Sequence, residues 1–142
     1  MRSYDNDFAG WAEDTARAIC DGRWSDIDRR HLADEVADLA RRERRAIRSR
    51  YTVLFLHLLK QRYQPMKASP SWEASILEQR IRLRELLEEN PSLATVSETS
   101  DAMARAYRLA RVQAVRETGF RIDTFPVELP FSNEDIWGDD SA

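Results

Sequence analysis

The sequence is poor in the residues that cross-link or interrupt a chain. Its 142 residues include one cysteine, four glycines and five prolines. Because Cys20 has no second cysteine to pair with, an intrachain disulfide is excluded and a reducing cytoplasm is the expected setting. The scarcity of glycine, together with many strong helix formers, favours an all-α fold. The length fits one domain, 1–142, with a core of its own.

Long hydrophobic runs are also missing. The longest apolar stretch, residues 53–59, is interrupted by His57 and is far too short to span a bilayer. The first residues, MRSYDNDF, carry acids and aromatics where a secretory signal needs basic residues followed by an apolar run. We therefore expect no membrane partner. The formal net charge of −3 gives the chain as a whole no electrostatic reason to bind nucleic acid.

Catalytic and metal-binding motifs are absent as well. The sequence contains no cysteine pair, no Gly-rich phosphate loop, no G-x-S-x-G and no H-E-x-x-H. His31 and Glu35, with Asp38 adjacent, have the spacing of a metal-binding pair on one helical face. Carboxylate metal sites in bundles also need Glu residues from several helices and Glu-x-x-His pairs, which do not occur here. We therefore expect no metal and no cofactor.

The sequence does contain strong helical periodicity. Capping residues and prolines divide it into four main predicted helices, at about residues 5–21, 28–64, 70–89 and 91–118. Asp5 is the expected cap of the first helix and Gly22 its C-terminal stop, and Ser97 is a candidate for a fresh cap inside the fourth. Ser132 should cap a final short turn through Trp137. An extended, Pro-containing C-terminal segment, 119–142, is rich in large apolar residues and should wrap across the helices. The predicted fold is an all-α up-and-down bundle around the long 28–64 helix.

Helical projection assigns a buried face to each predicted helix. Trp24, in the connector between the first two helices, is expected to pack against the core. The large apolar residues expected to be buried on these grounds include Phe8, Ile19, Trp24, Val36, Leu39 and Val96.

Polar residues interrupt the apolar stripe of the long helix. Glu43, Arg50 and His57 project into it, and Glu35 belongs to the same buried polar row. Glu43 and His57 are two heptads apart, about 21 Å along the axis, so they cannot share one catalytic or metal site. Each should find its own partner across the bundle, and we favour a role in fixing helix register over a functional one.

A polar pocket near His57 is the alternative interpretation. In a hairpin folded about Pro65, His57 lies roughly level with residues 76–80 of the facing helix, and the pocket would be lined by Trp72, Gln79 and Arg80. His57 would then act as a general base or ligand contact, and Arg80 would hold an anion. This interpretation predicts a concave opening beside His57.

An arginine cluster surrounds Glu43 on the long helix. Its side chains point all round the helix rather than along one stripe, and the aromatic residues lie on buried faces instead of among them. A solvated face is therefore favoured over contact with nucleic acid. The cluster consists of Arg41, Arg42, Arg44, Arg45, Arg48 and Arg50.

Several runs, taken in order, resemble the bacterial family called domain of unknown function 29 over nearly the whole chain: YDNDFAGWAEDTARAI, LADEVADLARRERRAIRSR, HLLKQRYQP, SWEASILEQR, ENPSL and ETGFRIDTFP. The resemblance implies a small all-helical protein without an assigned activity. This chain departs from the family pattern at Ala40, where glycine is usual, and at Arg42, where serine is common. Ala40 thus puts a kink at this point in doubt. The pattern includes the positions of Glu35, Glu43, Arg50, His57, Lys60, Tyr63, Pro65, Trp72, Arg80 and Gly119.

These features favour a non-enzymatic protein-interaction or regulatory domain of the bacterial cytoplasm. The expected partner is a second copy, as a homodimer, or another protein, because catalytic signatures are absent and the C-terminal segment is unusually apolar. The alternative is a small-ligand binder or enzyme using the pocket of His57, Trp72, Gln79 and Arg80. Nucleic-acid binding through the cluster Arg41–Arg50 is less favoured.

Overall fold

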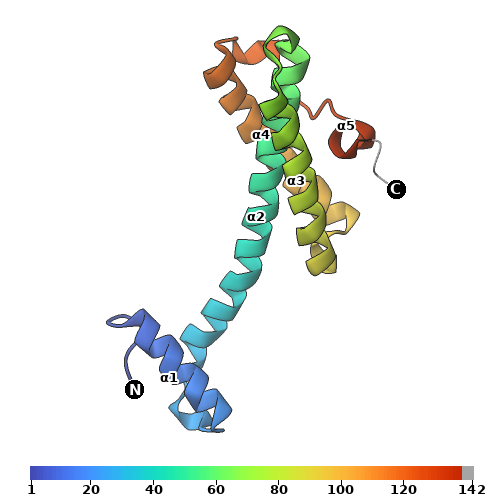
Figure 1. Ribbon diagram of the computed structural model, residues 1–142. Helices are drawn as coiled ribbons and strands as arrows, with labels where there is room; N and C mark the ends of the chain where they lie inside the picture. Colours follow the sequence, from blue (N-terminus) through green and yellow to red (C-terminus); the bar gives the residue numbers. More distant parts are fainter. Residues whose placement is uncertain (139–142) are drawn as a thin grey trace. The chain divides into compact units, whose positions relative to one another are not determined.

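The structure, a computed structural model, describes residues 1–138 (Figure 1). The predicted all-α fold, with four main helices of which one is long and central, is confirmed, and no strand occurs among the described residues. No helix in that part of the chain is long and apolar enough to cross a bilayer. The helices are α1 (Phe8–Cys20), α2 (Arg29–Tyr63), α3 (Pro70–Glu89), α4 (Val96–Thr118) and the short α5 (Asn133–Trp137), with 3-10 turns at Trp24–Asp26, Pro65–Lys67, Pro91–Leu93 and Ile122–Thr124.

The contacts within the chain group it into two compact units. The N-terminal unit is Met1–Arg42, and the C-terminal unit begins at Glu43. Helix α2 runs unbroken from Arg29 to Tyr63 and contributes residues to both units. The single domain expected for residues 1–142 stays a prediction.

In the N-terminal unit, α1 begins later than predicted. The backbone N–H of Asp7 donates to the Ser3 carbonyl at 3.0 Å, which closes a turn before the helix. The Asp7 side chain then accepts from the N–H of Gly10 at 2.9 Å and caps the helix. Asp5, the predicted cap, lies inside the preceding turn. Gly22 follows the helix with a φ of +71°, a left-handed conformation that stops it as expected.

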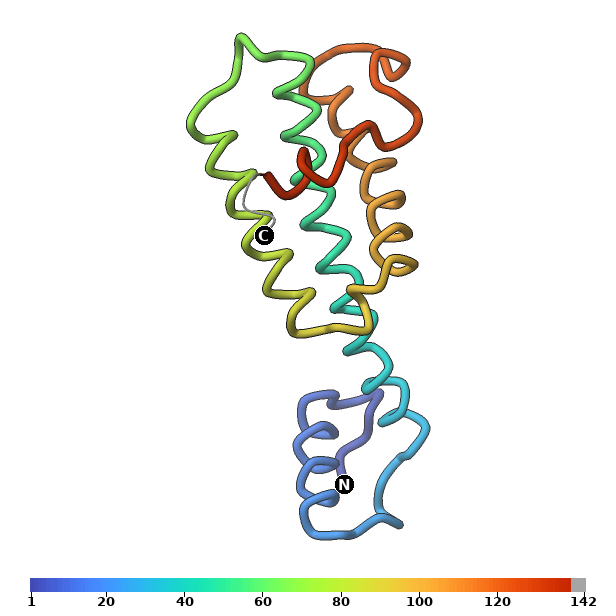
Figure 2. Tube along the Cα trace, turned by 90° about the vertical axis from the view of Figure 1, so that its right-hand side faces the viewer, coloured from blue at the N-terminus to red at the C-terminus, as the bar shows by residue number. Residues whose placement is uncertain are grey.

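The C-terminal unit is built on the second part of α2. Helices α3 and α4 lie alongside it, as Figures 1 and 2 show from two directions. Aromatic rings fill the centre: Phe55 packs on Tyr51 and on Phe131 with centroids 5.6 and 5.9 Å apart. The largest fully buried side chains of this unit are Tyr51, Tyr107, Phe55, Phe125, Leu54, Leu59, Leu83 and Ile136.

The segment after α4 crosses this core as predicted, and its residues 139–142 lie outside the described ones. Arginine side chains hold its backbone: Arg111 donates to the carbonyls of Phe125 and Ile122 at 3.0 and 2.9 Å. The Tyr107 hydroxyl donates to the Pro126 carbonyl at 2.6 Å. Ser132 caps the final helical turn in a capping box with Asp135, as the sequence indicates.

Helix α4 begins at Val96 rather than near residue 91. Pro91–Leu93 forms a separate 3-10 turn, closed by the N–H of Ala94 donating to the Pro91 carbonyl at 3.1 Å. Thr95 is extended, and its side chain accepts from the N–H of Glu98. The helix thus has its own cap, two residues before the candidate Ser97.

Six of the large apolar residues expected to be buried are exposed instead. Trp24 is 64% exposed, because it lies in a surface turn between α1 and α2. Val96 is 83% exposed at the first position of α4. The remaining four belong to the N-terminal unit, where they line a hollow between α1 and the first part of α2: Phe8, Ile19, Val36 and Leu39.

Candidate functional site

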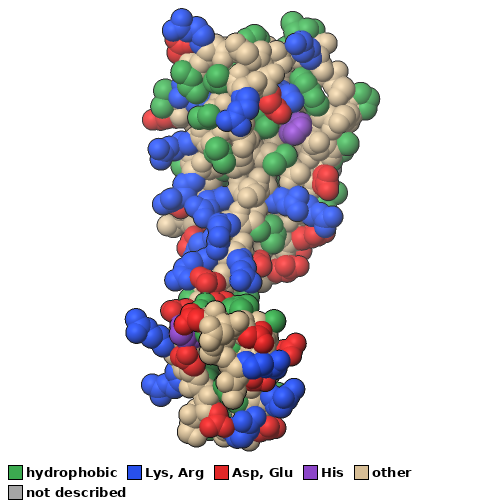
Figure 3. Space-filling model, turned by 90° about the vertical axis from the view of Figure 1, so that its left-hand side faces the viewer, with side chains coloured by type: hydrophobic (Ala, Val, Ile, Leu, Met, Phe, Trp, Pro, Cys, Tyr) green, Lys and Arg blue, Asp and Glu red, His purple; other side chains and the backbone are tan. Residues whose placement is uncertain are grey.

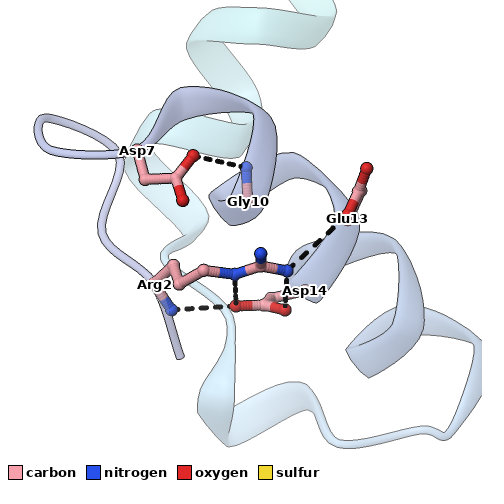
Figure 4. A network of polar contacts seen from close by, with 5 residues as sticks. All are labelled: Arg2, Asp7, Gly10, Glu13 and Asp14. Carbon is pink, nitrogen blue, oxygen red and sulfur yellow. Dashed lines mark hydrogen bonds and ion pairs between the residues drawn. The ribbon is translucent and has the colours of Figure 1, made fainter.

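The residues before α1 are tied back onto that helix (Figure 4). The Arg2 guanidinium donates to both carboxylate oxygens of Asp14, at 3.1 and 2.9 Å, and the Arg2 backbone N–H donates at 2.8 Å. These bonds hold the pKa of Asp14 well below its usual range. A Cβ on Gly10 would lie 2.5 Å from Asp7 Oδ2 and 2.6 Å from Arg2 Cδ, so the lack of a side chain there permits the close approach.

Tyr4 is placed by this segment between α1 and α2. Its ring stacks on His31 with centroids 4.0 Å apart and meets the Trp11 ring edge-on at 4.9 Å. Its hydroxyl donates to Glu35 Oε1 at 2.5 Å. That hydrogen bond, followed by burial, raises the pKa of Tyr4 to about 12, so the phenol stays a neutral donor at physiological pH.

The residues considered for a metal site have partners within the protein. His31 Nδ1 lies 2.5 Å from Asp28 Oδ2, and this hydrogen bond raises the pKa of His31 and lowers that of Asp28. Glu35 accepts from Tyr4, and Asp38 pairs with Arg41. Among the described residues, no group of three or more His, Cys, Asp or Glu side chains could hold a metal ion.

An apolar groove runs between α1 and the first part of α2. It encloses about 240 Å³ and lies entirely within the N-terminal unit. Four large side chains along it remain open to solvent: Phe8 is 49%, Ile19 38%, Val36 58% and Leu39 56% exposed. Glu35 is the one charged residue in its lining. We call this surface the α1–α2 groove; it is lined by Phe8, Trp11, Ala12, Thr15, Ala16, Ile19, Leu32, Glu35, Val36 and Leu39.

Two polar atoms beneath the groove lack hydrogen-bond partners among the described residues. They are Trp11 Nε1 and Thr15 Oγ1, whose residues are only 4% and 2% exposed. A buried polar group without a partner loses its hydration and gains nothing in return. Among the described residues, the buried side-chain polar atoms without a hydrogen-bond partner therefore lie in the N-terminal unit.

The polar row of α2 is divided among separate partners. Asn90 Nδ2 donates to Glu43 Oε2 at 2.8 Å, and Arg50 Nη1 donates to Gln79 Oε1 at 3.3 Å. Glu35 lies in the N-terminal unit, where it accepts from Tyr4. All three are half-buried. These contacts suit residues that fix how neighbouring segments align, and each involves a different partner.

The predicted pocket residues around His57 also make separate contacts. His57 Nδ1 donates to the carbonyl of Val53 on its own helix, at 2.8 Å, and the ring is half-buried. The Trp72 ring lies under the Lys60 ammonium at 4.6 Å. Gln79 is buried and accepts from Arg50. Arg80 donates to the Ile136 and Asp135 carbonyls at 2.8 and 3.0 Å and so holds α5.

The arginine cluster is partly paired. Arg41 pairs with Asp38, Arg44 with Glu98 and Arg50 with Gln79. On the face drawn in Figure 3, Lys and Arg side chains gather over the middle of the surface, with Asp and Glu side chains among and around them. A surface that binds nucleic acid presents a continuous basic stripe, usually with aromatic side chains on which bases stack. Part of the cluster is thus engaged in contacts within the protein, which suits a solvated face better than a nucleic-acid site.

Comparison with known proteins places the chain in a family. Residues 3–141 match the family described as "Domain of unknown function DUF29". The chain belongs to this family. No curated protein and no solved structure matches the chain.

Membership of the DUF29 family agrees with the resemblance found in the sequence and supplies no activity. The features that sequence patterns missed lie outside helical periodicity. Tyr4 precedes α1, so no face could be assigned to it. The exposure of Val36 and Leu39 depends on how many helices cover them.

Proposed function

We propose that this DUF29 protein is a non-enzymatic protein-interaction module of the bacterial cytoplasm, and that its partner is a second copy of itself. The observation that carries the proposal is the α1–α2 groove, with four large apolar side chains open to solvent. Contiguous exposed apolar surface of this kind is typical of interaction sites. Two-helix units bury such surface well by pairing into a four-helix arrangement.

The shape of the surface favours a second copy. Exposed alanines alternate with the large residues on both helices, including Ala12 and Ala16 on α1 and Ala33 and Ala40 on α2. In a two-fold dimer the same patch meets itself, so large side chains of one copy can pack over the alanines of the other. The only charged lining residue, Glu35, already accepts a hydrogen bond from Tyr4.

The energetics are compatible with a reversible dimer. Covering the exposed half of a Phe, Ile, Val or Leu side chain contributes about 1 kcal/mol, so four on each of two copies contribute about 8 kcal/mol. Losses of translational and side-chain freedom on association are of similar size. The alanine contacts then decide the balance, and we expect a weak dimer that dissociates on dilution.

The effect of salt on binding distinguishes self-association from the binding of a basic helix. The N-terminal unit carries seven Arg and ten Asp or Glu, a net charge of −3, whereas the remainder of the chain is neutral. Two such units repel, so added salt should strengthen the dimer. A basic partner would bind more weakly as salt is added.

Sedimentation velocity tests the proposal. Val36→Glu places a charge in the groove and should weaken dimerisation at least tenfold without lowering the melting temperature, since Val36 is 58% exposed. Val112→Glu is the matched control, because Val112 is 50% exposed on α4 in the C-terminal unit and should leave the dimer intact. A wild-type protein that stays monomeric, or a Val36→Glu dimer as tight as the wild type, would refute self-association through this groove.

A further inference from the structure

We propose that a cavity between α2 and α4 binds an organic carboxylate that carries a small apolar group. The cavity lies within the C-terminal unit and encloses about 250 Å³. Its lining includes three arginines and two acids above an apolar floor. This site is independent of the α1–α2 groove and of self-association.

The floor of the cavity is formed by the hydrophobic core. Ile47 from α2 is 3% exposed and Leu93 from the turn before α4 is 7% exposed. Both line the cavity, so the small part of each side chain that is exposed faces its interior. Ala102 of α4 completes the lining and leaves room because its side chain is a single methyl group. An alkyl or small aromatic group of a ligand can be buried here.

The rim of the cavity carries three arginines and two acids, so one positive charge is not balanced by an acid. Arg44 pairs with Glu98 at 3.2 Å, and Arg105 pairs with Asp101 at 2.9 Å. Arg48, one helical turn after Arg44, is half-buried and makes no side-chain hydrogen bond or ion pair with any described residue. Each acid on the rim is thus neutralised by an arginine, and Arg48 remains as the cation that a ligand could engage.

This charge balance selects the class of ligand. A guanidinium presents two parallel N–H donors that match the two oxygens of a carboxylate. A single surplus cation suits a monoanion better than a phosphate dianion, which would lie close to Glu98 and Asp101. The apolar floor adds a preference for carboxylates with a hydrocarbon group over acetate. A free metabolite acid and the C-terminal carboxylate of a peptide share this chemistry.

Calorimetric titration of the full chain with hexanoate tests the site. Hexanoate should bind at least tenfold more tightly than acetate, which lacks the apolar group, and than hexanamide, which lacks the charge. Arg48→Gln should weaken hexanoate binding at least tenfold. The matched control is Arg45→Gln, the same substitution at an exposed arginine of α2 outside the cavity lining, which should bind as the wild type does.

A second variant removes the space rather than the charge. Ala102→Leu fills the opening above the floor and should also weaken hexanoate binding at least tenfold, while melting curves confirm that both variants are folded. N-acetyl-leucyl-leucine, with a free carboxylate, distinguishes the sources: tighter binding than hexanoate supports a peptide C-terminus, and weaker binding supports a metabolite acid. Equal binding of hexanoate and hexanamide, preference for inorganic phosphate, or no heat up to about 10 mM hexanoate would overturn the proposal.

Discussion

At the scale of single residues, hydrogen-bond satisfaction differs between the two units. The hydroxyl of Thr52, in the C-terminal unit, donates to the Arg48 carbonyl at 2.8 Å. Thr15, in the N-terminal unit, is 2% exposed and its hydroxyl has no partner among the described residues. Both residues are helical and buried, so the same substitution at each isolates the effect of the missing partner.

Thr15→Val should therefore stabilise the N-terminal unit. The substitution keeps the shape of the side chain and removes an unpaired hydroxyl, which should raise the free energy of unfolding by about 1 kcal/mol. Amide hydrogen exchange of α1 measures the change in this unit directly. Thr52→Val is the control: it loses a hydrogen bond and should be neutral or destabilising by up to about 1 kcal/mol. A loss of protection in α1 of Thr15→Val would show that the hydroxyl has a partner in solution.

At the scale of elements, α5 shows how a helix of one turn is kept in place. Ser132 and Asp135 satisfy its N-terminus, while Arg80 of α3 donates to carbonyls near its C-terminus. Ile136 is buried in the core from the same turn. Such a short helix has no stability of its own, so its order depends on these contacts.

Arg80→Met should release α5 from α3. Methionine preserves most of the apolar length of the side chain but cannot donate, so two carbonyls lose a charged donor at a cost of about 2 kcal/mol. The amides of α5 should then exchange faster with solvent, which hydrogen-exchange mass spectrometry detects. Arg82→Met, on an exposed face of the same helix, should leave the exchange of α5 unchanged. Undiminished protection of α5 in Arg80→Met would mean that Ile136 and the capping box suffice.

The elements also show how far sequence reasoning reaches. Periodicity and capping residues located the four main helices and the turn at Ser132, because these signals are local. The projection of Glu43 and Arg50 into the stripe of α2 was informative, but their partners, Asn90 and Gln79, depend on how α3 lies against α2. Val36 was predicted to be buried because a stripe shows which face is apolar, and it does not show whether another helix covers that face.

At the scale of the whole molecule, the two units should respond differently to pH. In the N-terminal unit the pKa of Asp14 and that of Asp28 are lowered, whereas that of His31 is raised by its hydrogen bond to Asp28 and by the nearby Asp5 and Asp34. In the described part of the C-terminal unit, the pKa of the Asp135 carboxyl is lowered by its hydrogen bonds with Ser132. Among the described residues, most of the carboxyls whose pKa is lowered thus lie in the smaller unit.

The signs of these shifts define a window of maximal stability for the N-terminal unit. The contributions of Asp14 and Asp28 are complete above their unfolded pKa of 3.8 and are lost as the pH falls through the lowered folded values. The contribution of His31 is complete below its unfolded pKa of 6.5 and is lost as the pH rises through the raised folded value.

Amide exchange should therefore show α1 best protected near pH 5, with α3 and α4 changing less at higher pH. In Asp28→Asn the His31 pKa, followed by NMR, should fall and the loss of protection above neutral pH should disappear. If α1 and α4 lose protection in parallel above neutral pH, the His31–Asp28 contact is not what sets the alkaline limit of the N-terminal unit.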